Sequence, residues 1–430
     1  MPTSPVTVLD CTLRDGGYYN DWDFDTDLVE SYVEQLALGG VDIIELGFRF
    51  TDKSKFYGPF AHTSEDFLAT LNLPKGPTYG VMINASDYLT DRAEEDMSLN
   101  FVPAEKSLIS LVRIAAHLRQ VPQCGPMIAR LKSLGYLVGL NIMQISQADD
   151  ATIRSLVETI EKEFVEFEAL YFADSLGNMR PDDIRRVVGL IRAATGKSIG
   201  FHGHDNISLG VSNSLTAIES GATWIDATIT GMGRGAGNTQ MEYLSTELKN
   251  RGLADLKCMH IHEAATGRFS RMQAEYGWGT NLFYYEAGLQ AVHPTYVQQM
   301  IQSKRFEPLD ILTMIGQLGK SDKNLSYSDA NIESAFAGFL HEAQGRDDMA
   351  GKWTGRQVVL VAAGPNAKRH WPAIKDYAER NQALVLSVNA NDFVSPDDLD
   401  GAICVHPARL LSFFRMKSWA NVPLYTSRPA

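Results

Sequence analysis

Two histidines separated by a single residue, His202 and His204, are the pair in this sequence best suited to bind a metal ion. They end an apolar run over residues 199–204, which predicts a β-strand. Side chains two positions apart on a strand point to the same face, about 7 Å from each other, so both imidazole rings can bind one cation. A second pair with this spacing, His260 and His262, stands at the start of a predicted helix, where such positions diverge, and is assigned to the surface.

Polar side chains also follow other apolar runs. Arg14 and Asp15 come after the run at residues 6–10, and the two glycines behind them are expected to let the chain turn tightly. The glycine-rich stretch 231–238 ends in Asn238, whose amide oxygen is a candidate metal ligand. Each stretch taken alone also fits an ordinary helix cap or surface turn. Further polar groups at strand ends predict a substrate cavity rather than a sealed core: Glu45, Asn84, Asn141, Asp174 and Ser175.

The elements that would position these residues alternate along the chain. The predicted strands are residues 6–10, 43–47, 79–83, 111–114, 137–143, 170–174, 199–204 and 224–228, and the predicted helices between them include 28–38, 127–134, 151–161, 181–194 and 209–219. This alternation predicts a parallel (β/α)8 TIM barrel, whose active site lies at the carboxyl ends of the strands. An open doubly wound sheet is the alternative, but no GxGxxG motif follows the first strand.

Three domains are predicted: the barrel at 1–245, a helical extension at 246–352 and a small α/β module at 353–430. The extension shows helical patterns at 253–273, 294–306 and 331–342. The module has a half-Rossmann pattern, with strands at 358–362, 383–388 and 399–405 and a helix at 368–379. Its Gly364 turn suits a nucleotide, but a single Gly-Pro turn is weak evidence, and a structural or docking role is preferred.

Bulk composition narrows the class of protein. A net charge of −13 argues against nucleic-acid binding as the main function. No apolar run reaches the roughly 18 residues of a membrane span, and the N-terminus lacks the pattern of a secretory signal. The four cysteines, Cys11, Cys124, Cys258 and Cys404, form no CxxC pair, which fits a reducing compartment. We therefore expect a cytoplasmic protein without nucleic-acid or membrane partners.

Three motifs resemble those of the HMG-CoA lyase-like, or DRE-TIM, metallolyases, and most closely those of the 4-hydroxy-2-oxovalerate (pyruvate) aldolases. The motifs are Leu13-Arg14-Asp15-Gly16, the stretch GFHGHDN at 200–206 and the stretch GMGRGAGN at 231–238. They occur in the family's order and at its strand positions. The resemblance covers the barrel and, loosely, the helical segment after it.

The resemblance implies roles for individual residues. Asp15, His202, His204 and Asn238 would bind Mn²⁺ or Mg²⁺, and Arg14, oriented by Glu45, would stabilise an enolate. Substrate-binding residues would be Ser175, Asn141, Asp174 and Tyr296. The aldolases have a histidine as catalytic base where this chain has Tyr18, so the candidates for the base are Tyr18, His62 and a metal-bound water. The absence of lysine from all eight predicted strands leaves metal catalysis rather than a Schiff base.

The predicted function is therefore a metal-dependent aldolase that interconverts a 4-hydroxy-2-oxo acid with pyruvate and an aldehyde. The glycine-rich stretch contains no cysteine, which argues against CoA-ester lyase activity. Two alternatives remain: a Claisen-type condensing enzyme resembling isopropylmalate or citramalate synthase, and a non-catalytic binding protein. By analogy, a homodimer and a dehydrogenase or other pathway enzyme as partner are expected. The C-terminal module resembles one appended to aldolase-like proteins of surface-polysaccharide gene sets.

Overall fold

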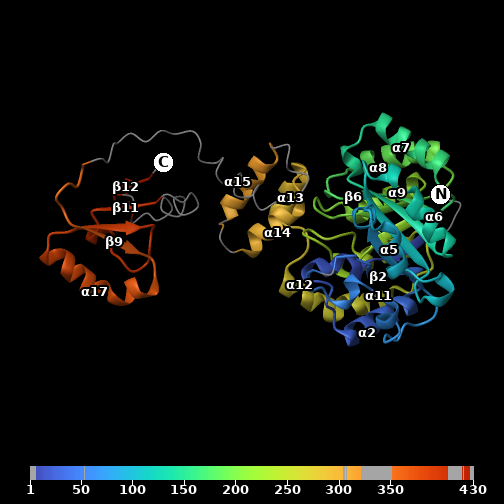
Figure 1. The fold of residues 1–430 in the computed structure, drawn as a ribbon, viewed down its shortest axis with the longest axis horizontal. Helices are drawn as coiled ribbons and strands as arrows, with labels where there is room; N and C mark the ends of the chain where they lie inside the picture. Colours follow the sequence, from blue (N-terminus) through green and yellow to red (C-terminus); the bar gives the residue numbers. More distant parts are fainter. Residues whose placement is uncertain are drawn as a thin grey trace. The chain divides into compact units, whose positions relative to one another are not determined.

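The computed structural model describes residues 6–52, 54–303, 306, 308–320, 351–404, 419 and 421–426. The chain divides into two compact units, Met1–Gln298 and Gln299–Ala430. The first contains the predicted barrel and the second contains the predicted α/β module (Figure 1).

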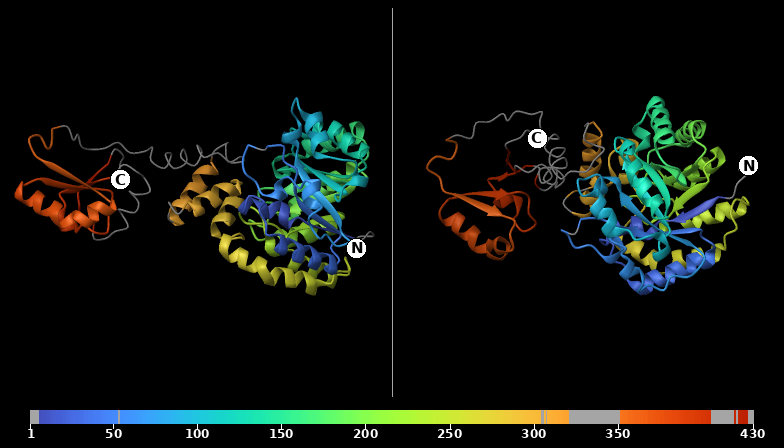
Figure 2. Two further views of the ribbon diagram at one scale, coloured as in Figure 1. Left: turned by 60° about the horizontal axis from the view of Figure 1, so that its bottom comes forward. Right: turned by 45° about the vertical axis from the view of Figure 1, so that its right-hand side comes forward.

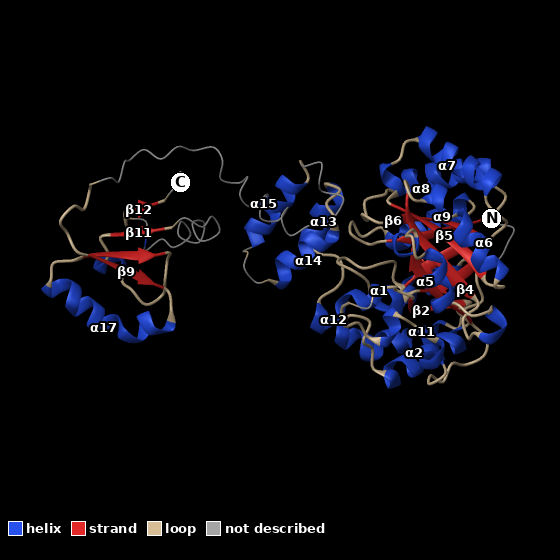
Figure 3. Ribbon diagram, viewed as in Figure 1, coloured by secondary structure: helices blue, strands red, loops and turns tan. Residues whose placement is uncertain are grey.

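Eight parallel strands form a closed barrel in sequence order, and β8 pairs with β1 to close it. The open-sheet alternative is thereby excluded. The strands lie inside a ring of helices (Figures 2 and 3). They are β1 (Thr7–Asp10), β2 (Ile43–Phe48), β3 (Thr78–Asn84), β4 (Leu111–His117), β5 (Leu137–Met143), β6 (Ala169–Asp174), β7 (Ser198–Gly203) and β8 (Trp224–Ala227).

Each strand leads into helical structure that covers the barrel. Helix α8 shows why: its apolar residues Ile184, Val187, Val188 and Ile191 recur with helical spacing and are all buried. The helices of this part are α1 (Thr12–Gly16), α2 (Thr26–Gly39), α3 (Glu65–Leu68), α4 (Ala85–Tyr88), α5 (Ala93–Asn100), α6 (Gly125–Ser133), α7 (Asp150–Glu163), α8 (Pro181–Ala194), α9 (Gly210–Ser220) and α10 (Met241–Asn250).

Further helices follow the barrel: α11 (Cys258–Ala264), a π-helical turn (Ala265–Phe269), α12 (Ser270–Tyr276), α13 (Leu282–Leu289) and α14 (Pro294–Gln302). The first two α-helices and the turn replace the single helix predicted at 253–273, and α11 packs against α2 of the barrel. The helices up to residue 298 thus belong to the barrel unit, although the sequence pattern changes near residue 245. The helix predicted at 331–342 lies outside the described residues.

The second unit contains α15 (Pro308–Leu318) and a parallel sheet in the order β12-β11-β10-β9. The strands are β9 (Val358–Ala362), β10 (Leu384–Val388), β11 (Gly401–Ile403) and β12 (Leu424–Tyr425), and α17 (Pro365–Arg380) connects the first two. Ala378 of α17 packs on Val361 and Val385 of the sheet, which forms the core of the predicted half-Rossmann-like module. The strand β12 was not predicted.

No helix in the described parts of the chain is both long and apolar enough to cross a membrane. All four cysteines are buried, and none of them forms a disulfide with another described residue.

Candidate active site

The arginine and aspartate after β1 are held by the short helix α1. Its first turn is closed by Asp10, whose carboxylate accepts the backbone N–H of Thr12 at 2.8 Å. The chain turns here through α1 and a 3-10 turn at Gly17–Tyr19, but Gly16 and Gly17 have ordinary helical φ angles of −67° and −58°, so the turn does not depend on the conformational freedom of glycine. Their role is close packing: a Cβ on Gly16 would lie 2.5 Å from the sulfur of Met232, and one on Gly17 would lie 2.1 Å from the Trp22 ring.

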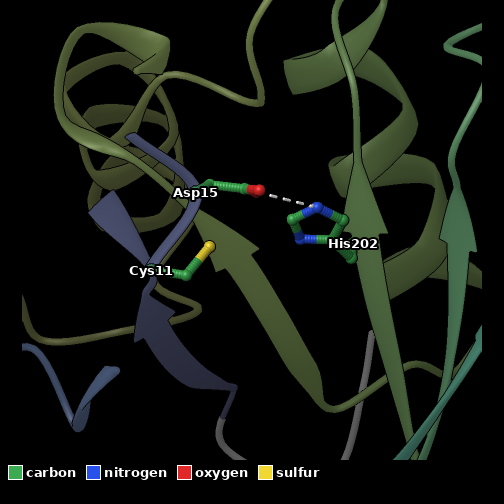
Figure 4. Close-up of side chains that lie close together, drawn as sticks. All are labelled: Cys11, Asp15 and His202. Atoms are coloured by element: carbon green, nitrogen blue, oxygen red, sulfur yellow. Dashed lines mark ion pairs between the residues drawn. The ribbon is translucent and has the colours of Figure 1, made fainter. Parts of the chain in front are cut away.

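The four predicted metal-binding side chains converge on one place at the carboxyl end of the barrel. The Asp15 Oδ2 atom lies 3.2 Å from His202 Nε2 (Figure 4) and accepts a hydrogen bond from the Asn238 amide at 2.5 Å. The His202 and His204 rings are 5.1 Å apart, centre to centre. Residues His204 and Asn238 form an antiparallel backbone bridge, so the glycine-rich loop is pinned beside the end of β7.

Partners on the far side of each imidazole set the direction of the ring. His202 Nδ1 lies 2.9 Å from the Asp226 carboxylate, and His204 Nδ1 lies 3.2 Å from the backbone carbonyl of Ser175. Both acceptors favour a proton on Nδ1 and leave Nε2 as the nitrogen that can bind a cation. The control pair diverges, as predicted for helix positions two apart: His260 and His262 belong to α11 and contact Gln35 and Thr246, although both are half-buried rather than on the surface.

The donor atoms fit a hard divalent cation. Burial alone would raise the pKa of Asp15, but Arg14 and His202 outweigh it and hold that pKa well below its usual range, so the carboxylate is charged. The Asn238 Oδ1 atom is buried without a hydrogen-bond partner among the described residues. Cys11 lies close to Asp15 and His202 (Figure 4), but burial raises its pKa well above the usual value, so we regard it as a neutral packed thiol. Oxygen and imidazole donors suit Mn²⁺ or Mg²⁺.

Two of these donors, Asp15 and His202, belong to a closed ring of ion pairs. Arg14 binds Asp15 at 2.7 Å and Glu45 at 2.8 Å, as predicted for Glu45. Arg113 joins Glu45 to Asp226 at 2.7 and 2.6 Å, and Asp226 returns to His202. Arg113 and Asp226 were not predicted as site residues. The sequence feature that could have identified them is a charged residue inside an otherwise apolar predicted strand.

Replacing Arg113 with methionine is expected to lower the free energy of unfolding by about 3–5 kcal/mol, because it removes a fully buried cation and leaves Glu45 with Arg14 alone and Asp226 with His202 alone. Urea denaturation followed by circular dichroism measures this. The matched control is Arg92→Met, since Arg92 is exposed and its loss should change stability by no more than about 0.5 kcal/mol. Equal effects of the two substitutions would contradict the structural role of the ring.

A cavity of about 150 Å³ opens beside these donors, a size that suits a small acid. Of the predicted residues, those that line it are Arg14, Asp15, Tyr18, Asn84, Asn141, Ser175, His202 and His204. Four polar lining residues were not predicted as site residues: His117, Gln144, Arg234 and His293. His117 is the last residue of β4, and the other three come from loops and from the segment before α14, where no periodic pattern marks the inward direction.

Three predicted candidates lie elsewhere. The Asp174 carboxylate accepts the backbone N–H groups of Asn178 and Met179, so it organises the loop after β6; burial raises its pKa to about 7. Tyr296 is fully buried in α14 and is not among the lining residues, whereas His293, three positions earlier, reaches the cavity. His62 contacts the carbonyl of Phe50 and is likewise outside the lining.

Comparison with known proteins assigns the family. The HMGL-like family model matches residues 109–266. A 4-hydroxy-2-oxovalerate aldolase of Albidiferax ferrireducens is 31% identical over 258 residues, which are 58% of this chain and 71% of the relative. The chain belongs to the HMGL-like family. This family assignment confirms the predicted carbon–carbon lyase and sets aside the non-catalytic alternative.

Three further similar proteins are consistent with this family assignment and with the barrel fold. An oxaloacetate decarboxylase of Mycobacterium tuberculosis is 28% identical and matches 77% of this HMGL-like chain and 96% of the relative. The N-terminal domain of a Bacteroides vulgatus protein described as an aldolase is 31% identical with a TM-score of 0.64, covering 71% of this chain and 99% of that one. The carboxyl transferase domain of Rhizobium etli pyruvate carboxylase, 17% identical with a TM-score of 0.57 over 76% of this chain and 56% of that one, shares the fold.

Proposed function

We propose that this HMGL-like protein is a pyruvate aldolase that uses Mn²⁺ or Mg²⁺ to form or cleave a 4-hydroxy-2-oxo acid. The observation that carries the proposal is that Asp15, His202 and His204 line one small cavity beside Arg14, with Asn238 hydrogen-bonded to Asp15. When bound by these four residues, the cation would act as a Lewis acid and stabilise negative charge on the substrate oxygen.

Arg14 has one nitrogen available for the substrate. Its Nη1 and Nε atoms bind Asp15 and Glu45, whereas Nη2 is buried and has no hydrogen-bond partner among the described residues. We assign this N–H group to the oxygen that becomes negative when the carbon–carbon bond breaks. A donor placed in advance at such an oxygen contributes about 3–4 kcal/mol to transition-state stabilisation.

Ser175 and Asn141 are assigned to the 2-oxo acid. The Ser175 hydroxyl oxygen accepts the backbone N–H of Gln144 at 2.9 Å, which leaves its own hydrogen to donate to a substrate carboxylate. Asn141 lines the same cavity, where its Nδ2 group can donate to a substrate oxygen; its buried Oδ1 atom, which has no partner among the described residues, can only accept a hydrogen bond.

His293 is the imidazole best placed to move the proton of the substrate 4-hydroxyl. It lines the cavity, and its Nδ1 atom accepts a hydrogen bond from the backbone N–H of Thr295 at 3.4 Å. To accept a proton at Nε2, the imidazole must carry its hydrogen on Nδ1. This tautomer loses only the long hydrogen bond from Thr295. His117 also lines the cavity but is engaged with Gln144. Burial raises the pKa of Tyr18, so its hydroxyl stays protonated and acts as a hydrogen-bond donor.

A second candidate activity is decarboxylation of oxaloacetate. The Mycobacterium tuberculosis relative of that name matches 77% of this chain. Loss of carbon dioxide from oxaloacetate leaves the same pyruvate enolate, so Arg14 would play the same part. The Claisen-type alternative differs in its products: it predicts release of free thiol when acetyl-CoA and a 2-oxo acid are mixed with the enzyme.

The proposed function is tested by Mn²⁺-dependent exchange of the pyruvate methyl protons in deuterated buffer, followed by proton NMR. We expect the wild-type protein to exchange them, since forming the enolate removes one methyl proton and returning a deuteron completes the exchange. Absence of exchange with either Mn²⁺ or Mg²⁺ would defeat the proposal.

A further inference from the structure

Arg234 is a cavity-lining cation that no carboxylate of the described residues balances. It lies in the glycine-rich loop between β8 and α10, and its Nε atom is buried without a hydrogen-bond partner in the part of the chain that the structure describes. Arg14 and Arg113, by contrast, are matched by acidic groups at 2.6–2.8 Å. A partly buried guanidinium without a counter-charge is unfavourable, and an anion entering the cavity relieves that cost.

The loop holds this guanidinium firmly. Gly235 has a φ of +66°, and a Cβ there would lie 2.8 Å from Pro294, so the loop packs directly on the segment that carries His293. One face of the Arg234 guanidinium lies over the Tyr18 ring, 5.2 Å from its centre. Stacking uses the face of the group and leaves the N–H donors in its plane available for a ligand.

Arg234 and Arg14 line the cavity from different elements, Arg234 from the glycine-rich loop after β8 and Arg14 from α1. Arg14 lies 5.9 Å from the Phe48 ring, whose centre is 6.4 Å from that of Tyr18, and Arg234 is on Tyr18. The pyruvate end is already assigned to Arg14, the cation-binding residues and Ser175. The group near Arg234 is therefore the remainder of the substrate, beyond the bond that forms or breaks.

We propose that Arg234 selects an acceptor aldehyde that carries an anionic group, a carboxylate or a phosphate. This inference rests on the proposed aldolase function and identifies its substrate class: a 4-hydroxy-2-oxo acid with a second acidic group. In the synthetic direction the methyl carbon of pyruvate loses one proton and bonds to the aldehyde carbon, and the aldehyde oxygen gains one proton. No oxidant or further reactant is needed, and the anionic group of the acceptor is unchanged.

The test compares matched acceptors with the full-length protein, Mn²⁺ and pyruvate. Succinic semialdehyde is paired with butanal, and glyceraldehyde 3-phosphate with glyceraldehyde, so each pair differs in its anionic group; the two pairs distinguish carboxylate from phosphate. We expect kcat/KM to favour the anionic member of at least one pair by about 10–100-fold, the range for a charge-assisted hydrogen bond. Arg234→Met should bring this ratio to near one, and Arg234→Lys should keep part of it.

Arg185→Met is the control, because Arg185 is an exposed residue of α8 whose ion pair within the described residues is with Asp182, three positions earlier, and it should keep the wild-type ratio. A wild-type ratio near one for both pairs, or a ratio unchanged in both Arg234 variants, would overturn the inference. Pyruvate exchange measured without an acceptor distinguishes failure of this inference from failure of the proposed function. If the wild-type protein exchanges the methyl protons but shows no preference for anionic acceptors, only the role of Arg234 is wrong. If the wild-type protein shows no exchange, the aldolase function itself is wrong.

Discussion

Replacing His202 with alanine is expected to abolish tight Mn²⁺ binding and to slow pyruvate methyl exchange by about 10³-fold or more. The reason is that His202 Nε2 and the Asp15 carboxylate face each other at 3.2 Å, so both point to the place where a cation would lie. Lewis-acid stabilisation contributes several kcal/mol, and each 1.4 kcal/mol corresponds to a factor of ten in rate. Calorimetric titration with Mn²⁺ and the exchange rate are the two measurements.

The sequence provides a matched control in its other histidine pair. His260→Ala should retain both binding and exchange, since His260 lies in α11 and contacts Gln35. His204→Ala is the second test variant, because the partner of its Nδ1 atom is a backbone carbonyl and its removal leaves the ion-pair ring intact. Normal Mn²⁺ affinity in both His202→Ala and His204→Ala would show that the cation, if any, binds elsewhere.

The barrel was predictable because its strands are continuous apolar runs with a glycine or an asparagine at their breaks. The strand at 137–143 and the helix at 181–194 match the structure at both ends. The helices after the barrel were predicted less well, since a π-helical turn interrupts the pattern at residues 265–269. The strand β12 has only two residues and no pattern of its own.

The site was predictable where one strand or motif carries the information. The pair His202 and His204 follows from strand alternation alone. Arg113 could not be found in this way, because its partners Glu45 and Asp226 lie 68 and 113 positions away in the sequence and meet only when the barrel closes. The same limit applies to His293, whose segment reaches the cavity through packing of Pro294 on the glycine-rich loop.

Replacing His293 with alanine is expected to slow aldol cleavage and pyruvate exchange together by about 10²–10⁴-fold, the range for loss of a general base. A single imidazole would take the proton from the 4-hydroxyl during cleavage and return it to the methyl carbon, so both reactions need it. Mn²⁺ affinity should be unchanged, which separates this variant from His202→Ala. Cleavage rates, exchange rates and Mn²⁺ titration are measured on the same preparations.

Tyr18→Phe is the decisive comparison, because Tyr18 occupies the place that the sequence assigned to the base. It removes one hydroxyl but keeps the ring under Arg234, and the loss of a single hydrogen bond predicts a decrease of about tenfold or less. A large loss in Tyr18→Phe together with a small one in His293→Ala would transfer the role to Tyr18.

The basicity of His293 connects the two proposals. Burial first, and then the charge of Arg234, lower the pKa of His293 to about 2 in the free protein, so the ring is neutral at physiological pH but is a weak base. An anion paired with Arg234 would offset the second effect and raise that pKa, while the larger effect of burial would remain. An anionic acceptor should therefore increase kcat as well as lower KM, whereas an acceptor without charge should leave the imidazole a weak base. An anion effect confined to KM would show that Arg234 binds the acceptor without influencing proton transfer.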